Sequence, residues 1–455
     1  MRRRLNGPKR TPSQPSHERS RSILDFGRRS KCEFHARERS AGDRISANAQ
    51  CGWTECALSQ RLKIIRRARL LIVEEAASLT EAANHFRQRP TAEILTSEVV
   101  PLAAACRFLE DESGRILRGR RLGWRRRPLW LSGVHSEIQR EPHGLILIIA
   151  PGNYPLFLPA VQTLQALVAR NAVLIKPGDN GSRAAQAFVE ILHRAGLPQN
   201  LAHVLSEEAI AAQSAIELGI DKVILTGSAS TGQAVLAQCA KTLTPTTIEL
   251  SGCDAVFVRA DADLDLVVRA LRFGLRLNNG ATCIAPRRVF VNRDLVSELE
   301  TRLRAAIFET SLILDPRRLG CVTDALVAGA DFVKGSIQSD GQLLSVPIIL
   351  SAVASSMRIA CEDIFAPVLS LIPVANDAEA LAFSLQCPYA LGAAIFSRDA
   401  AAAHSFAGKV RAGVVVINDL IVPTADPRLP FGGRGRSGFG TTRGAEGLLE
   451  MTTPR

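Results

Sequence analysis

Short apolar runs alternate with amphipathic stretches through the middle of the chain. Five runs are apolar nearly throughout, and the segments between them repeat apolar residues every three or four positions, as helices do. The runs cover residues 144–150, 172–175, 202–205, 223–225 and 246–250, and the helical segments cover 156–169, 183–194, 209–218 and 233–241. Fully apolar strands that alternate with helices are typical of a parallel sheet covered on both faces. Such a sheet holds its ligand at the carboxyl ends of its strands.

The flanking regions carry other patterns. Residues 56–110 have a helical period, and 118–141 form a basic, tryptophan-containing segment that could be a hairpin arm. In the second half we expect helices over 264–277 and 295–307, whereas 314–345 are poorly patterned. The remaining apolar runs, read as strands, cover 255–258, 288–291, 369–374, 391–396 and 414–417, before a glycine-rich stretch over 430–440. The sequence contains no evident internal repeat.

The first 50 residues differ from the rest in charge and pattern. They carry 13 Lys and Arg against 5 Asp and Glu, a net of +8 out of +12 for the chain. With almost no apolar periodicity, such a segment cannot bury enough surface to offset its ordering entropy, so we expect a disordered basic tail over 1–50. Nucleic-acid attachment, an organelle presequence and a wrongly chosen start codon are alternatives. The acidic residues within the tail argue against a presequence.

Composition sets further bounds. A chain of 455 residues with 46% hydrophobic and 22% charged residues is long enough for two or three globular domains. No uncharged apolar stretch reaches the roughly 18 residues of a membrane span, so we expect none. The ten cysteines are scattered without a CxxC or zinc-finger spacing. We therefore expect no metal site and no disulfide framework, and a reducing, cytoplasmic location.

The ends of the apolar runs carry unusual residues. Pro151-Gly152-Asn153-Tyr154-Pro155 follows the first run and Lys176-Pro177-Gly178-Asp179 the second. Thr226 to Gly232 follows the fourth run, and Glu249 to Gly252 lies at the end of the fifth. Each alone could be an ordinary turn. Together they would meet at one edge of the sheet, which predicts a ligand site there. In the second half, Cys283 lies in a loop of small residues between a helix and a strand. A lone cysteine is more often buried and structural, and only these other motifs favour a reactive one.

In this order the motifs resemble those of the aldehyde dehydrogenase superfamily, over about residues 55–455. The matching stretches are Pro151–Asn153, Lys176–Asp179, Thr226–Gly232, Glu249–Gly252, Gly280–Cys283, Glu362–Pro367, Asn418 and Phe431–Gly440. The chain departs from the family pattern at several positions. Gly152 replaces Trp, Ser251 and Ala366 replace Gly, Ala281 replaces Gln, Cys253 replaces Lys and Asp363 replaces Glu.

The resemblance implies an α/β fold in three parts. A Rossmann-like parallel-sheet domain for NAD(P) would comprise 51–122 and 142–252. An α/β catalytic domain would comprise 253–430. A small β arm for oligomerisation would comprise 123–141 and 431–455, so we expect a homodimer or homotetramer.

The resemblance also implies roles for three catalytic residues. Cys283 would be the nucleophile that adds to an aldehyde carbonyl. The Asn153 amide and the Cys283 backbone N–H would stabilise the resulting oxyanion. Glu249 would activate the water that hydrolyses the thioester.

Cofactor contacts follow from the same comparison. Lys176 and Asp179 would lie on the adenosine ribose, where a carboxylate favours NAD over NADP, although NADP remains possible. Gly227, Ser228 and Gly232 belong to the turn that would meet the pyrophosphate. Asp363 and Phe365 would contact the nicotinamide ribose and ring.

Two rival functions stay open. The same fold could pass the acyl group to coenzyme A or phosphate, although Glu249 favours water. In a different class, the chain could be a non-catalytic binding protein whose basic tail recruits nucleic acid, which the presence of Cys283, Glu249, Asn153 and Lys176 makes the weaker interpretation. The sequence predicts a small-molecule aldehyde as substrate without naming it.

Overall fold

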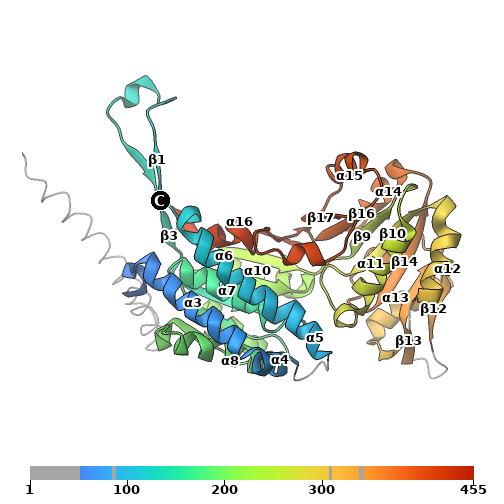
Figure 1. The fold of residues 1–455 in the computed structure, drawn as a ribbon, viewed down its shortest axis with the longest axis horizontal. Coiled ribbons are helices and arrows are strands. Elements are labelled where there is room, and N and C mark those ends of the chain that lie inside the picture. Colours follow the sequence, from blue (N-terminus) through green and yellow to red (C-terminus); the bar gives the residue numbers. More distant parts are fainter. Residues whose placement is uncertain (1–51, 85–88, 307–309, 338–342) are drawn as a thin grey trace, which may run out of the picture.

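The structure is a computed structural model, and it describes residues 52–84, 89–306, 310–337 and 343–455. The expected disordered tail over 1–50 lies outside these residues. Two α/β bodies stand side by side, and a hairpin projects from the first of them (Figure 1). Among the described residues, no helix has both the length and the apolar character needed to cross a bilayer.

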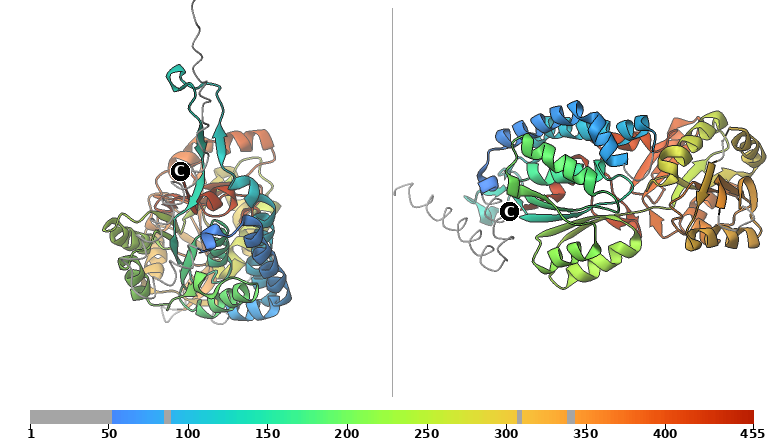
Figure 2. Two further views of the ribbon diagram at one scale, coloured as in Figure 1. Left: turned by 90° about the vertical axis from the view of Figure 1, so that its left-hand side faces the viewer. Right: turned by 90° about the horizontal axis from the view of Figure 1, so that it is seen from below.

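The first body is built on a six-stranded sheet. Its strand order is β19-β8-β7-β4-β5-β6, and all neighbours are parallel except β19, which runs antiparallel to β8. The strands are β4 (Leu145–Ile149), β5 (Ala172–Lys176), β6 (Ala202–Val204), β7 (Lys222–Gly227), β8 (Thr246–Leu250) and β19 (Gly438–Phe439). Every residue of β4 is buried, because helices cover both faces of the sheet (Figure 2). This is the sheet that the apolar runs predict.

Helices of the first body cover both faces of the sheet, and helices from the N-terminal region form a further layer outside them (Figure 2). The crossover helices are α7 (Phe157–Val168), α8 (Ser182–Arg194), α9 (Ala209–Glu217) and α10 (Ala229–Ala240). Outside α7 and α8 pack α3 (Leu58–Glu74), α4 (Ala76–Asn84), α5 (Thr91–Ile94) and α6 (Val100–Ile116), with a π-helical turn over Leu95–Val99. The amphipathic period of 56–110 thus marks an outer helical layer, as expected.

The second body contains an eight-stranded sheet. Its order is β11-β13-β14-β10-β9-β16-β17, with β12 also paired to β13. The strands are β9 (Asp254–Val258), β10 (Pro286–Asn292), β11 (Thr310–Ile313), β12 (Asp331–Ile337), β13 (Leu343–Ser351), β14 (Val368–Val374), β16 (Gly392–Phe396) and β17 (Val414–Ile417). The helices are α11 (Leu264–Arg276), α12 (Val296–Ala306), α13 (Pro316–Val327), α14 (Asp377–Ser384) and α15 (Ala400–Ala407). The poorly patterned region 314–345 therefore contains a helix and two strands.

The projecting hairpin pairs β1 (Arg120–Leu122) with β2 (Ser136–Ile138), in the segment where a hairpin arm is expected. At its base β3 (Arg140–Pro142) pairs with β20 (Thr452–Pro454), near the chain's end (Figure 1). The rest of the segment 431–455 lies elsewhere: β18 (Arg434–Gly435) pairs with β15 (Tyr389–Ala390), and α16 (Gly444–Glu450) packs on α6 and α7. Of the strands and helix in residues 431–455, the C-terminal segment assigned to the arm, only β20 pairs with the arm. The domain boundaries and the role of the arm in oligomerisation stay predictions.

Candidate active site

The Cys283 loop begins where α11 ends, and three consecutive residues have positive φ. Asn278 and Asn279 both have φ of 50°, and Gly280 has φ of 69°. A Cβ on Gly280 would lie 2.5 Å from the backbone nitrogen of Pro367. The backbone of residues 366–367 therefore fills the space beside Gly280. The glycine lets the loop pack against the segment that carries Asp363 and Phe365.

Asn153 connects the first body to this loop. Its Nδ2 donates to the Ala281 carbonyl at 3.0 Å, and the Asn278 Nδ2 donates to the Asn153 carbonyl at 2.9 Å. Next to it, the hydroxyls of Tyr154 and Thr282 are 2.8 Å apart. The turn after β4 is therefore hydrogen-bonded to the residues that immediately precede Cys283.

Glu249 is the penultimate residue of β8 and is 2% exposed. Its Oε2 accepts a hydrogen bond from the Thr442 hydroxyl at 2.9 Å, whereas Oε1 has no partner among the described residues. Burial raises the pKa of this carboxyl, and the Arg443 guanidinium and the Thr442 hydrogen bond oppose that rise. Glu249 thus has one anchored oxygen and one free oxygen, as a proton acceptor requires.

The surroundings of the Cys283 thiol also favour its neutral form. Burial raises its pKa well above that of a free thiol, and the carboxyls of Glu249 and Asp254 raise it further. The Arg443 guanidinium and the backbone N–H of Ile284 act in the opposite direction. Cys283 and Glu249 therefore compete to carry one negative charge in a buried site.

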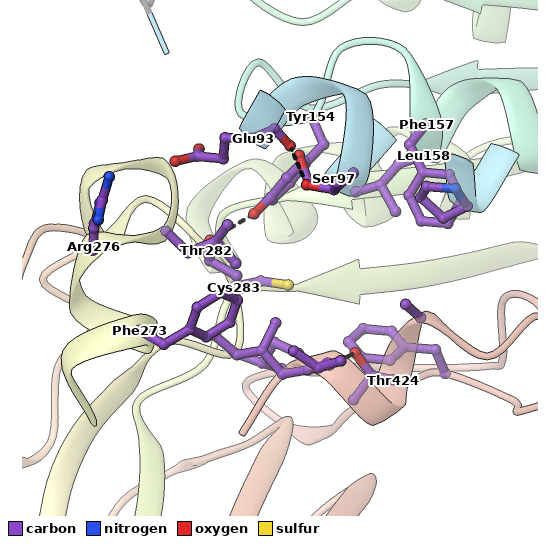
Figure 3. A pocket seen from close by; sticks show the side chains of 18 of the residues that line it. Glu93, Ser97, Tyr154, Phe157, Leu158, Phe273, Arg276, Thr282, Cys283 and Thr424 are labelled. Carbon is purple, nitrogen blue, oxygen red and sulfur yellow. Dashed lines mark hydrogen bonds between the residues drawn. The ribbon is translucent and has the colours of Figure 1, made fainter. Parts of the chain in front are cut away.

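Two cavities meet at Cys283 and Glu249. One of about 620 Å³ is mostly apolar, and Figure 3 shows the Cys283 sulfur pointing into it. The other, of about 510 Å³, is lined by the loops that follow β4, β5, β7 and β8. Asn153 lines the second cavity, and Leu158 lines both. The three candidate catalytic residues thus share one cavity although they are far apart in the sequence.

The polar cavity contains most of the predicted cofactor residues. Asp179, Gly227, Ser228, Asp363 and Phe365 all line it. The Ser228 hydroxyl accepts from the Thr231 N–H at 3.2 Å and so caps α10, whose N-terminus faces this side. Unpaired N–H groups at a helix N-terminus attract anions, which suits a pyrophosphate.

Lys176 and Gly232 are not among the residues that line either cavity. Lys176 ends β5. Against the effect of burial, hydrogen bonds from Ser182 and Asn180 lower the pKa of Glu207, and the Lys176 charge adds a smaller contribution. Gly232 lies inside α10, where a Cβ would come within 2.9 Å of the Leu250 side chain. This glycine allows close packing of the helix on the sheet.

Sequence reasoning missed residues on both cavities. Arg317 and Arg318 of α13 line the polar one. Phe273 and Arg443 line the apolar one. A signal for α13 was present, since Asp315 followed by Pro316 is a typical helix start. Nothing in the local pattern marks Arg443 as a buried residue.

A family model, described as the aldehyde dehydrogenase family, matches residues 32–455. The chain belongs to this family. Membership makes it an NAD(P)-dependent enzyme that oxidises an aldehyde, with the α/β fold that the sequence predicts. The catalytic roles predicted for the thiol, carboxyl and amide that converge here stay predictions.

The similarity to known proteins extends over most of this chain and most of each relative. A 4,4'-diapolycopene aldehyde oxidase from Methylomonas sp is 29% identical over 90% of this chain and 79% of its own length. The structure of a Mycobacterium tuberculosis aldehyde dehydrogenase complexed with NAD+ aligns with a TM-score of 0.80 at 25% identity, over 92% and 90% of the two chains. That of an NADP-dependent glyceraldehyde-3-phosphate dehydrogenase from Bacillus halodurans complexed with NADP aligns with a TM-score of 0.81 at 29% identity, over 91% and 89%.

Proposed function

We propose that this enzyme oxidises a large apolar aldehyde to its carboxylic acid, with NAD as the preferred cofactor. The observation that carries the proposal is the meeting of an apolar and a polar cavity at one thiol and one carboxyl. The aldehyde would enter through the apolar cavity and the dinucleotide would lie in the polar one. When bound, the nicotinamide supplies the hydride acceptor.

Cys283 acts first in the proposed reaction. Its proton passes to the carboxylate of Glu249, and the thiolate sulfur adds to the aldehyde carbon to give a thiohemiacetal anion. The Asn153 amide and the backbone N–H of Cys283 donate to the oxyanion, which a buried site cannot leave unpaired. Loss of hydride from the same carbon leaves a thioester on Cys283.

Glu249 acts in the second half. Once its proton has been released, the free Oε1 accepts a proton from a water molecule that attacks the thioester carbon. The tetrahedral adduct then collapses to the carboxylic acid and the Cys283 thiolate, which takes up a proton. Each turnover therefore consumes one water and one hydride acceptor and yields one acid.

Asp179 supports NAD over NADP. It lines the polar cavity next to Asn180, at the turn after β5. A carboxylate there accepts a hydrogen bond from the ribose 2′-hydroxyl and repels a 2′-phosphate. The cations of this cavity, Arg317 and Arg318, come from the opposite body and are paired with Glu362 and Asp315.

The lining of the substrate cavity supports an apolar aldehyde. Phe157, Leu158, Phe273, Leu277, Ile284, Ile421, Val422 and Phe431 contribute to its wall. Phe273 and Val422 are 42% and 54% exposed, so the apolar surface extends to solvent. Burying apolar substrate surface here contributes roughly 25 cal/mol per Å².

An aldehyde panel tests this function. With NAD, kcat/KM should rise several-fold for each two carbons added to a straight-chain aldehyde, because each buried methylene contributes about 0.8 kcal/mol. Absorbance of reduced nicotinamide gives the rate, and NADP in place of NAD should lower kcat/KM. A preference for short or carboxylate-bearing aldehydes would contradict the substrate class.

The product distinguishes the acyl-transfer rival. In the presence of coenzyme A and of phosphate, the free acid should remain the only product by mass spectrometry. An acyl-CoA or acyl phosphate would reassign the second half of the reaction. No aldehyde oxidation with either dinucleotide would remove the proposal as a whole.

A further inference from the structure

Arg443 is a buried cation on the wall of the substrate cavity. It is 7% exposed. Its Nη1 donates to the Thr424 carbonyl at 2.7 Å, while Nε has no hydrogen-bond partner among the described residues. The guanidinium carbon lies 4.2 Å from the ring centre of Phe431 and 5.9 Å from that of Phe157. The side chain is therefore fixed by one carbonyl and two rings, none of which neutralises its charge.

The backbone holds this side chain in an uncommon conformation. Arg443 has φ of 60° and ψ of 174°, a region that a residue with a long side chain rarely adopts. Its neighbour Thr442 is fixed by two backbone hydrogen bonds with Phe431, of 2.7 and 2.8 Å. The Gln165 side chain donates to the carbonyl of Gly444 on the other side. Such conformations persist where surrounding contacts enforce them, often at functional sites.

Two groups that can carry negative charge share the cavity wall with Arg443. Glu249 and Cys283 both line the same cavity. Thr442, directly before Arg443 in the chain, donates its hydroxyl to Glu249 at 2.9 Å. Phe431, which lies under the guanidinium, belongs to an apolar cluster that packs against Cys283. The same short segment therefore contacts the carboxyl, and Phe431, on which Arg443 packs, belongs to the cluster against which Cys283 lies.

The other charged or titratable groups near the cavity are hydrogen-bonded, paired with an opposite charge, exposed, or on a neighbouring strand. Tyr154 is bonded to Thr282, and burial raises its pKa further above neutrality. Behind it, Arg89 and Glu98 form a buried ion pair. Two further charged residues line the cavity, Glu93 and Arg276; Glu93 accepts a hydrogen bond from the Asn278 N–H, and Arg276 is exposed. Asp254 acts on Cys283 from β9.

We infer that Arg443 is the positioning residue that supplies the balancing positive charge for the Cys283–Glu249 pair. The inference rests on the proposed function, in which the proton of Sγ moves to the Glu249 carboxylate. One negative charge is present before and after this transfer, first on the carboxylate and then on the sulfur. A fixed guanidinium beside both makes that charge tolerable in a buried site throughout the transfer.

Arg443 itself exchanges no proton, since a guanidinium stays protonated. Its effect is electrostatic: an adjacent cation favours the thiolate and the carboxylate over their neutral forms. Removing the charge should therefore raise the pKa values of both groups. The thiolate fraction at a given pH would fall, and the pH at which activity appears would move upward.

Alkylation of Cys283 by iodoacetamide measures this effect without any turnover. The rate at Cys283, followed by peptide mass spectrometry across pH 6–11, reports its thiolate fraction, and below the midpoint a tenfold change in rate corresponds to a midpoint shift of about one unit. In Arg443→Met the midpoint should rise by about one unit, which is about a tenfold lower rate at neutral pH. Arg443→Lys, which keeps a charge, should lie between Met and the natural enzyme. Arg436→Met, at an exposed arginine seven residues earlier in the chain, is the matched control.

Stability and binding controls separate charge from packing. NAD titration and thermal unfolding identify variants that still fold, and Arg443→Gln, whose amide can still donate to Thr424, replaces Met if that variant unfolds. An unchanged alkylation midpoint in a folded neutral variant would overturn the inference. So would a Lys variant as impaired as the neutral one. If the enzyme oxidised no aldehyde, the midpoint shift would still be measurable, so the two failures are distinguishable.

Discussion

At the scale of single residues, Glu249 is distinguished by its two unlike oxygens. Oε2 is anchored by Thr442, and Oε1 is buried without a partner among the described residues. An unpartnered buried oxygen costs about 1–3 kcal/mol, so a folded chain seldom keeps one without a reason. We interpret it as the acceptor for the thiol proton and then for a proton of water.

Glu249→Gln should separate the two halves of the reaction. The amide has nearly the same shape and can still accept from Thr442, but it cannot take a proton. Steady-state kcat should fall about 10²–10⁴-fold, the usual contribution of a general base. Stopped-flow absorbance should still show some reduced nicotinamide in the first turnover, before hydrolysis stalls.

Glu190→Gln, at an exposed position of α8, is the control for this change. It should turn over like the natural enzyme. If Glu249→Gln kept its full steady-state rate, another group would have to activate the water. Mass spectrometry of the stalled variant should detect an acyl group on Cys283.

Residue-level prediction from the sequence worked where a motif sits on a predictable element. Asn153 follows an apolar strand, Glu249 lies at the end of another, and Cys283 follows an amphipathic helix, so their positions relative to the sheet edges could be anticipated. Thr442 and Arg443 could not be placed in this way. They reach Glu249 because β19 pairs with β8, where Gly438 lies opposite Glu249. Two-residue strands such as β19 have no recognisable period.

At the scale of elements, the turns after β4 and β5 pack backbone against backbone. A Cβ on Gly178 would lie 2.2 Å from the carbonyl carbon of Pro151 and 2.3 Å from the nitrogen of Gly152. A Cβ on Gly152 would lie 3.0 Å from the Asp179 carbonyl oxygen. This contact explains how the chain tolerates glycine at 152 in place of the family's tryptophan: the Asp179 turn lies against it.

Gly178→Ala should therefore damage the cofactor cavity. A methyl group cannot fit within 2.3 Å of backbone atoms, so the Asp179 turn must move. We expect a loss of roughly 1–3 kcal/mol of stability, in the range of overpacked sites, and weaker NAD binding by fluorescence titration. Gly114→Ala is the control, because nothing lies within 4 Å of that position in α6. It should be neutral or stabilising by up to about 1 kcal/mol. Equal NAD affinity in both variants would contradict this packing argument.

Most elements were predictable because their burial gives a clear period. α11, for example, places Leu264, Val267, Val268, Leu271 and Leu275 in the core, at the three- and four-residue spacing that predicts a helix over 264–277. The failure at 314–345 has a physical cause in β12, whose side chains are mostly half-buried or exposed. An edge strand of mixed polarity lacks both the continuous apolar run of a central strand and a clean alternation.

At the scale of the whole molecule, the hairpin exposes side chains that usually lie inside proteins. Trp124, Leu129 and Trp130 are 77%, 92% and 83% exposed. Six arginines lie close by, at 118, 120, 121, 125, 126 and 127. A projecting apolar tip of this kind is typical of a contact surface, and it agrees with the expectation of a homo-oligomer.

Replacing both tryptophans by serine should shift the enzyme to a smaller species. Each tryptophan side chain would bury a large apolar area in an assembly, and the double substitution removes both of these areas. Size-exclusion chromatography with light scattering gives the mass. Leu243→Ser is the control, since Leu243 is 89% exposed outside the hairpin. A natural enzyme that is already monomeric, or a double variant of unchanged mass, would remove the arm's assigned role.

The meeting of two cavities at Cys283 also bears on the order of events in a catalytic cycle. In the proposed function, the aldehyde and the dinucleotide would approach the sulfur from different cavities, so neither would block the path of the other. The acid would then be able to leave while the reduced dinucleotide is still bound, and a high aldehyde concentration would not prevent exchange of the reduced dinucleotide. Binding and release in the two cavities would be independent, and only the sulfur between them would have to be free before the next cycle begins.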